Sequence, residues 1–263
     1  MIAIGYIASI LIGFSLGLIG GGGSILTVPV LVYLFHLDPV LSTAYSLFIV
    51  GSTSLAGGLR FYPKKLIDFQ AVWMFGIPSI ITVLLTRKYL LPIIPDTLFT
   101  IGSFELQKGT FLMLVFALLM IVSAARMIHQ NKIEEIAGEK KTNYLFRLIM
   151  QGFFVGIVTG LLGAGGGFLI IPALVLLMKI PMKKAVGTSL VIIAINSLSG
   201  FIFSLHSIEV NWQLLLTITG IAIVGVLVGI AFSDKVSAAS LKKSFGWFVL
   251  AMAIYIIIRE IFL

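Results

Sequence analysis

The chain has 263 residues, of which 59% are hydrophobic and only 11% are charged, and its mean hydropathy is +1.16. A soluble domain does not bury so much apolar surface, so the composition excludes a soluble protein and predicts an all-α polytopic membrane protein. The net charge of +8 is spread over many short loops, which is typical of membrane proteins, so we expect a lipid bilayer and no nucleic acid as partner.

The apolar segments fall into two groups of five. The first has no basic residue before it and no small-residue cleavage site, which indicates a retained membrane segment and not a signal peptide. We expect helices over residues 2–19, 25–36, 41–60, 69–91 and 107–128, and then over 145–162, 168–179, 184–205, 211–232 and 240–262. The polar residues 131–143 are interpreted as a linker between a first repeat (1–130) and a second (144–263) of one integral membrane domain.

Four consecutive glycines interrupt the stretch "GLIGGGGSILTVP" at Gly17–Pro29. Glycine is about 1 kcal/mol less favourable than alanine inside a helix, so the run predicts a break. A complete span needs about 20 residues, and segments 25–36 and 168–179, which each follow a glycine run, have about half that length. We therefore predict two half-helices whose N-termini lie near the bilayer midplane.

The glycine run occurs twice, because 143 residues later the chain reads "GLLGAGGGFLIIP". An ungapped comparison of Gly13–Gly57 with Gly156–Gly200 gives 17 identities in 45 positions. Chance in so biased a composition would give about one identity in ten. The protein is therefore interpreted as an internal duplication, with a glycine-broken helical hairpin and about three spanning helices in each half.

The distribution of lysine and arginine indicates how the repeats are oriented, because these residues collect in cytoplasmic loops. If each half crosses the membrane an odd number of times, one face holds 14 basic residues: Arg60, Lys64, Lys65, Arg126, Lys132, Lys140, Lys141, Arg147, Lys179, Lys183, Lys184, Lys235, Lys242 and Lys243. The other face then holds four, namely Arg87, Lys88, Lys108 and Arg259. An even number splits the same residues 9 against 9. We therefore predict inverted repeats in the inner cell membrane, a cytoplasmic linker and both termini outside.

Inverted repeats with broken helices are the architecture of many secondary transporters, whose site lies between the halves. A half-helix N-terminus presents unpaired N–H groups and a partial positive charge, which suits an anion, and no lysine or arginine is expected mid-span. Serine, threonine and asparagine in the third segment of each half supply further donors. The candidate site residues are Gly20, Gly21, Gly22, Gly23, Ser24, Ser46, Gly163, Gly165, Gly166, Gly167, Thr188, Ser189 and Asn196.

Structural explanations of the same residues stay open. Glycine runs also allow helices to cross closely, and serine or threonine hydroxyls often bond to their own helix backbone. Other chemistry is not expected: the three histidines have no ligand spacing, the absence of cysteine excludes thiolate sites, and no carboxylate lies mid-span. We accordingly expect neither an enzyme nor a metal or cofactor.

Both glycine motifs, "GFSLGLIGGGGSILTVP" at Gly13–Pro29 and "GIVTGLLGAGGGFLIIPAL" at Gly156–Leu174, resemble those of the TauE/SafE sulfite exporter family, and so does "KKAVGTSL" at Lys183–Leu190. The resemblance covers essentially the whole chain. It implies a transporter of sulfur-containing anions such as sulfite, thiosulfate or organosulfonates, with the glycine loops and Thr188–Ser189 at the substrate. The first repeat departs from this pattern, since it has "STAYSL" where the second has "AVGTSL".

The resulting hypothesis is a secondary transporter that moves a small sulfur oxyanion or organosulfonate by alternating access. An anion channel and a non-transporting membrane scaffold for a partner protein are the alternatives. The sequence leaves open which sulfur anion is moved, the direction of transport, a coupling ion (H⁺ or Na⁺) and homo-oligomerisation.

Overall fold

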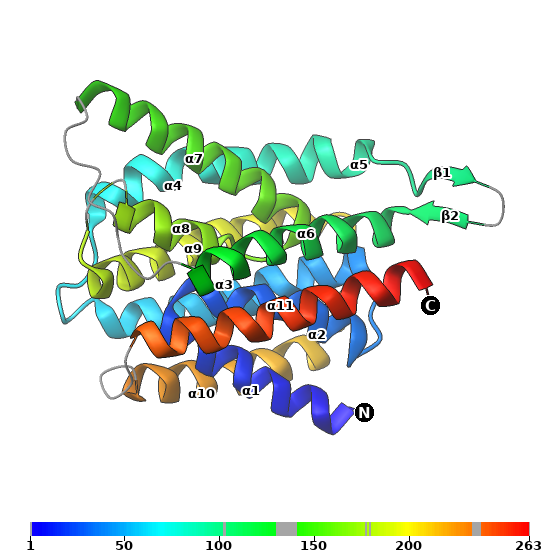
Figure 1. Cartoon of the computed structure of the whole chain (residues 1–263), viewed down its shortest axis with the longest axis horizontal. Coiled ribbons are helices and arrows are strands. Elements are labelled where there is room, and N and C mark those ends of the chain that lie inside the picture. Colours follow the sequence, from blue (N-terminus) through cyan, green and yellow to red (C-terminus); the bar gives the residue numbers. More distant parts are fainter. Residues whose placement is uncertain are drawn as a thin grey trace.

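The structure is a computed structural model that describes residues 2–101, 104–129, 141–176, 178, 180–232 and 238–262. This part of the chain is almost entirely helical (Figure 1). The first half contains α1 (Ile2–Ile19), a 3₁₀ helix η1 (Gly21–Leu26), α2 (Thr27–Tyr33), α3 (Pro39–Phe61), α4 (Phe69–Leu85), a π-helical turn η2 (Thr86–Leu90), α5 (Leu91–Ile93), strands β1 (Thr97–Ile101) and β2 (Phe104–Gln107), and α6 (Lys108–His129). The second half contains α7 (Lys141–Leu162), α8 (Gly167–Leu176), α9 (Met182–Ser204), α10 (Trp212–Phe232) and α11 (Ala238–Phe262).

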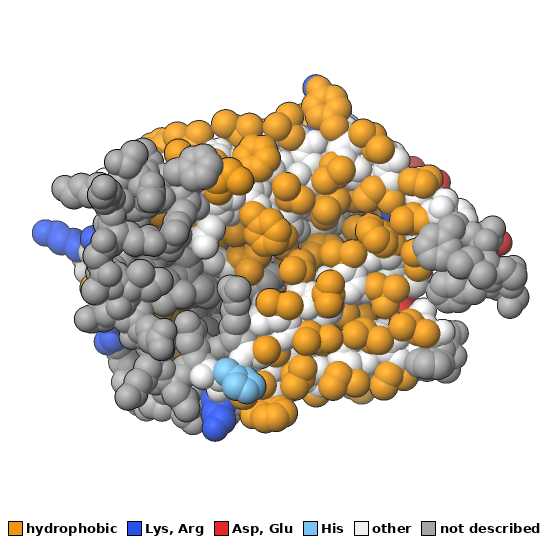
Figure 2. Space-filling model, turned by 45° about the horizontal axis from the view of Figure 1, so that its top comes forward, with side chains coloured by type: hydrophobic (Ala, Val, Ile, Leu, Met, Phe, Trp, Pro, Cys, Tyr) orange, Lys and Arg blue, Asp and Glu red, His pale blue; other side chains and the backbone are white. Residues whose placement is uncertain are grey.

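The expected all-α membrane protein is confirmed. Five helices in the described part of the chain are long and apolar enough to cross a membrane: Pro39–Phe61, Phe69–Ile93, Lys108–Ala125, Met182–Ser204 and Trp212–Phe232. Hydrophobic side chains cover the middle of the face in Figure 2, and the coloured charged side chains lie mostly toward its rims. This is the surface that a lipid environment requires, because charged groups are costly in the hydrocarbon region.

Each glycine run ends a long helix and is followed by a short one. α1 ends at Ile19 and α7 at Leu162, and the helices beyond the runs have 7 residues (α2) and 10 residues (α8). The first run differs from expectation, since Gly21–Leu26 continues as a 3₁₀ helix before α2 begins. α2 also ends at Tyr33, earlier than predicted. The carbonyl oxygen of Val30 accepts hydrogen bonds from Leu34 N (3.0 Å) and Phe35 N (3.3 Å), and His36 takes the left-handed backbone (φ 54°) typical of a helix C-terminus.

Polar caps set where several helices begin. Asp38 Oδ1 accepts hydrogen bonds from the N–H groups of Val40 (2.8 Å) and Leu41 (3.0 Å), and Pro39 occupies the first position of α3. The Asp68 carboxylate accepts from Ala71 N at the start of α4, and the amide oxygen of Asn211 accepts in the same way at the start of α10. These are the N-cap contacts that satisfy otherwise unpaired helix N–H groups.

Helices of one half pack mainly on helices of the other. The most extensive contacts join α1 with α10, α7 with α4, α3 with α9 and α6 with α11. The contacts repeat at an offset of 143 residues: Gly13 lies against the backbone of Ala222, and Gly156 lies against the backbone of Ser79. The two halves of the chain are therefore packed into one bundle. Residues 131–140 of the expected linker lie outside the described residues, and its boundaries stay a prediction.

The two chain ends lie on the same side of the molecule. The ends marked N and C, together with the β1–β2 hairpin, are on the right of Figure 1, whereas α6 ends and α7 begins toward the left. The hairpin itself was not expected, and it pairs Thr97 with Gln107 in an antiparallel ribbon. Its β-branched and aromatic residues favour a strand, but the segment is too short for a hydrophobic alternation to be read from the sequence.

Candidate functional site

The glycine turns adopt backbone conformations that other residues rarely take. Gly20 has φ of 76°, and Gly163, Gly165 and Gly166 have φ of 69°, 66° and 68°. Space is also limited, because a Cβ at Gly165 would lie 2.6 Å from Val50 Cγ1. Both turns therefore require glycine for left-handed backbone and for close approach.

The segments that follow the two turns lie side by side, since η1, which follows the first turn, packs against α8, which follows the second. Gly165 lies between Val50 of the first repeat and Ile193 of the second, which are equivalent positions at the 143-residue offset. The second turn is thus at the centre of the two repeats. The remaining candidates of the first run, Gly21, Gly22, Gly23 and Ser24, form the beginning of η1.

Ser46 and Ser189, a predicted pair, each lie at the glycine turn of the opposite repeat. Ser46 Oγ donates a 2.8 Å hydrogen bond to the carbonyl oxygen of Gly163. Ser189 Oγ would lie 3.4 Å from a Cβ at Gly20, and it donates to Val186 O of its own helix at 2.9 Å. Each turn region is therefore built from both halves of the chain.

Unpartnered hydroxyls surround the start of α8. Ser197 Oγ and Thr159 Oγ1 are buried and have no hydrogen-bond partner in the described structure. Ser197 Oγ would lie 3.2 Å from a Cβ at Gly165, and Thr159 Oγ1 would lie 2.5 Å from one at Gly166. A buried polar group without a partner costs about 1–3 kcal/mol, so such groups mark places where a ligand or water binds. Gly167, a predicted site residue, is the first residue of α8.

Asn196 is buried within α9, where it contacts α4. Its Nδ2 donates to Ser79 Oγ of α4 at 2.6 Å, whereas its Oδ1 has no partner among the described residues. Ser54 Oγ, the repeat equivalent of Ser197 Oγ, is likewise buried without a partner. The structure therefore groups Asn196 with buried polar side chains.

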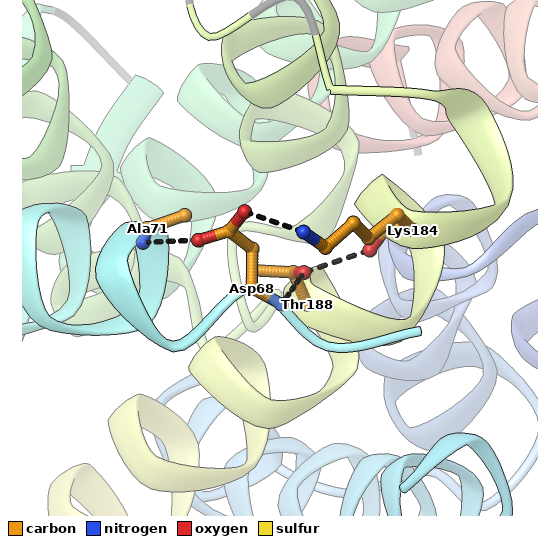
Figure 3. A network of polar contacts seen from close by, with 4 residues as sticks. All are labelled: Asp68, Ala71, Lys184 and Thr188. Carbon is orange, nitrogen blue, oxygen red and sulfur yellow. Dashed lines mark hydrogen bonds and ion pairs between the residues drawn. The ribbon is translucent and has the colours of Figure 1, made fainter. Parts of the chain in front are cut away.

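Thr188, by contrast, has a structural role that the sequence did not reveal (Figure 3). Its Oγ1 accepts a hydrogen bond from Asp68 N (2.8 Å) and donates one to Lys184 O (2.7 Å). Lys184 Nζ in turn forms an ion pair with Asp68 Oδ2 at 2.9 Å. These contacts fix the start of α4 on α9. The hydrogen bond from Lys184 lowers the pKa of the Asp68 carboxyl, although partial burial opposes the shift.

One of the four basic residues counted on the outer face is buried. Arg87, which was counted with Lys88, Lys108 and Arg259 on that face, lies in η2 with only 7% of its surface exposed. Its Nη2 donates to Thr43 Oγ1 at 3.1 Å. The sequence contains one indication of this burial, because Arg87 lies inside the apolar segment 69–91. It lies near the end of that segment, however, where the sequence cannot distinguish an arginine that reaches the membrane interface from one that turns into the protein.

The described residues contain no group of three or more histidine, aspartate or glutamate side chains that could hold a metal ion. Comparison with known proteins instead places the chain among transporters. A profile described as "Sulfite exporter TauE/SafE" matches residues 5–256. The chain belongs to the TauE/SafE sulfite exporter family. It is therefore a membrane transporter protein and not an enzyme.

Curated relatives of this TauE/SafE chain carry general names. "Probable membrane transporter protein YunE" of Bacillus subtilis (strain 168) is 30% identical over 240 residues, which are 85% of each chain. A "Probable membrane transporter protein" of Xylella fastidiosa (strain Temecula1 / ATCC 700964) is 30% identical over 258 residues, 95% of this chain and 92% of the relative. No solved structure matches. The family predicted from the glycine motifs is thus confirmed.

Proposed function

We propose that the protein is a secondary transporter of small sulfur-containing anions, such as sulfite, thiosulfate or an organosulfonate, and that it works by alternating access. The observation that carries the proposal is the polar centre at the start of α8. There the glycine turn, the free hydroxyls of Ser197 and Thr159, and the N-terminus of a short helix converge. Preorganised N–H and O–H donors of this kind suit an oxyanion.

The arrangement of the repeats supports alternating access. Helix pairs that join the halves correspond between the repeats, such as α1 with α10 and α7 with α4. A serine of the opposite half also lies beside each glycine turn. In an inverted-repeat transporter, rocking of one bundle against the other opens the central site first to one side and then to the other. We propose that the repeats are inverted, with the linker cytoplasmic and both termini outside.

A pocket with two basic residues at one end of the bundle also supports an anionic substrate. A cavity of about 610 Å³ lies where α3 and α10 end, and it is lined by apolar residues together with Arg60 and Lys64. Two cations at such a mouth raise the local concentration of anions. In the proposed orientation this cavity lies at the cytoplasmic end of the bundle.

The proposal is tested by uptake of radiolabelled sulfite and thiosulfate into proteoliposomes. We expect saturable flux that sulfur anions inhibit, that chloride does not inhibit, and that accelerates when unlabelled anion is present on the opposite side. Flux that neither saturates nor shows this exchange would indicate an anion channel. No flux of any sulfur anion through folded, inserted protein would refute transport of these anions and favour the scaffold.

The role of the glycine turn is tested separately with Gly165→Leu, and Gly220→Leu is the matched control. A side chain at position 165 would clash with Val50 and Ile193, and it would have to adopt the left-handed backbone of Gly165. A Cβ at Gly220 has nothing within 4 Å. We expect membrane insertion of both variants and loss of flux only in Gly165→Leu. Normal flux in Gly165→Leu would remove this turn from the site.

A further inference from the structure

Arg87 occupies an irregular turn at the end of α4. The π-helical turn η2 interrupts the regular hydrogen-bond pattern there, and such turns are frequent at functional sites. Arg87 is buried, whereas its neighbour Lys88 is exposed, with Nζ 5.1 Å from the centre of the Tyr89 ring. The same turn thus directs one cation into the protein and the other out of it.

The buried guanidinium of Arg87 has few hydrogen-bond acceptors and no negatively charged partner among the described residues. Nη2 donates to Thr43 Oγ1, a hydroxyl that itself donates to Val40 O at 2.7 Å, and Nε has no partner in the described part of the structure. No carboxylate among the described residues forms an ion pair with Arg87; the ion pair that this part of the chain does form joins Lys184 and Asp68. An unpaired buried charge is strongly unfavourable, so an anion is the missing partner.

Arg87 reaches the second glycine turn through Thr43. A Cβ at Gly163 would overlap the carbonyl oxygen of Thr43, and the carbonyl oxygen of Gly163 accepts the hydrogen bond from Ser46. The equivalents of Arg87 and Thr43 in the second repeat are Ile230 and Val186, which carry no polar group. A buried cation is therefore present near the Gly163 turn, and the equivalent position near the Gly20 turn holds an apolar side chain.

We propose that Arg87 is the cationic binding residue for the transported oxyanion at the Gly163 turn. This inference rests on the proposed function, since it takes the sulfur anion as the ligand. The guanidinium presents Nε–H and Nη–H groups in a planar fork, which matches two oxygens of a sulfite, thiosulfate or sulfonate group. A spherical chloride ion cannot use both directions of the fork equally well, so the residue also favours oxyanions over halides.

Binding is measured on the purified full chain in detergent, by the increase in melting temperature with sodium thiosulfate or sulfite at constant ionic strength, and chloride serves as the reference. The variants are Arg87→Gln and Arg87→Lys, with the exposed neighbour Lys88→Gln as the matched control. We expect the native protein and Lys88→Gln to bind both sulfur anions. Arg87→Gln should bind them about tenfold to a hundredfold more weakly, the range expected for loss of a charge-assisted contact. Arg87→Lys should be intermediate.

Retention of native affinity in Arg87→Gln would overturn the inference, as would failure of the native protein to bind either sulfur anion. Thr43→Val gives a second test that keeps the charge. It removes the acceptor that orients the guanidinium, and the loss of affinity should be smaller, about threefold to tenfold. A Thr43→Val protein that folds but discriminates oxyanion from chloride as the native protein does would contradict the positioning of Arg87.

Flux measurements separate this inference from the proposed function. Binding that depends on Arg87 without any flux would refute the transporter and leave the anion site standing. Saturable flux of thiosulfate that is unchanged in Arg87→Gln would leave the transporter standing and refute the role of Arg87.

Discussion

Several buried polar atoms near the centre of this bundle have no hydrogen-bond partner in the described structure. Peripheral hydroxyls such as Ser123 Oγ donate to their own helix backbone, in this case to Leu119 O at 2.8 Å. The hydroxyls of Ser197 and Thr159 and the amide oxygen of Asn196 have no such partner in the described structure. Because unpaired buried groups destabilise the fold, their concentration beside a glycine turn is better explained by ligand binding than by packing.

This interpretation predicts opposite effects of Ser197→Ala on stability and on binding. Removal of an unpaired hydroxyl should leave the melting temperature of the anion-free protein unchanged or raise it, whereas affinity for thiosulfate should fall about threefold to tenfold. Ser123→Ala is the control, and it should not change affinity. Thermal melting with and without anion measures both quantities. Unchanged affinity in Ser197→Ala would place its hydroxyl outside the anion site.

At the scale of elements, the two repeats dock their helices through equivalent hydrogen bonds. Asp68 N at the start of α4 donates to Thr188 Oγ1 of α9, and Asn211 N at the start of α10 donates to Tyr45 OH of α3 at 2.6 Å. The donors are 143 residues apart, and so are the acceptors. The residue types differ, yet the contact is the same, so the duplication is preserved here in geometry more clearly than in sequence.

Thr188→Val and Tyr45→Phe should therefore have similar effects. Each keeps the shape of the side chain and removes the acceptor, which leaves one partly buried N–H group unpaired and should destabilise the protein by about 1 kcal/mol. The melting temperatures of the two variants in detergent check this expectation. Thr219→Val, whose hydroxyl bonds to Leu215 O of its own helix, is the comparison. A drop in only one of the two docking variants would show that the contacts are not energetically equivalent.

The ion pair between Asp68 and Lys184 is present at one of these two contacts only, since Lys184 corresponds to Leu41. Its side chains are partly exposed, so a double-mutant cycle of Asp68→Asn and Lys184→Met should give a coupling energy of about 0.2–1 kcal/mol. A coupling energy near zero would mean that the aspartate serves only as the cap of α4.

The pH dependence of this ion pair follows from the lowered pKa of Asp68. A carboxyl whose pKa is lower in the folded state stabilises the protein fully above its unfolded pKa, and this contribution is lost as the pH falls through the folded pKa. The difference in melting temperature between the native protein and Asp68→Asn should thus stay constant through the neutral range and disappear only in acid. A difference that disappears near neutral pH would contradict this assignment.

At the scale of the whole molecule, the proposed orientation is testable because the chain contains no cysteine. A single cysteine at Lys64→Cys, between α3 and α4, should face the cytoplasm, and one at Ser207→Cys, between α9 and α10, should face outward. A membrane-impermeant maleimide applied to intact cells should label only Ser207→Cys, and both should react after lysis. Labelling of Lys64→Cys in intact cells would reverse the orientation.

The class of protein, the positions of most apolar helices, the two breaks and the family could all be predicted from the sequence. These features depend on local properties: hydropathy over about 20 residues, the low helix propensity of glycine, and a repeat that can be aligned directly. The same alignment also paired Ser46 with Ser189, because both occupy the same position in each repeat; their role at a substrate stays a prediction.

The pairing of polar groups, in contrast, could be seen only in the folded chain. Thr188 has its partner 120 residues away, and Arg87 meets Thr43, 44 residues away, so neither contact leaves a local pattern. Which helix of one half packs on which helix of the other also leaves no local pattern, because it depends on close contacts such as those at Gly13 and Gly156. Burial and pairing are properties of the packed bundle, and a hydropathy profile cannot distinguish a cation at the membrane interface from one that faces the centre.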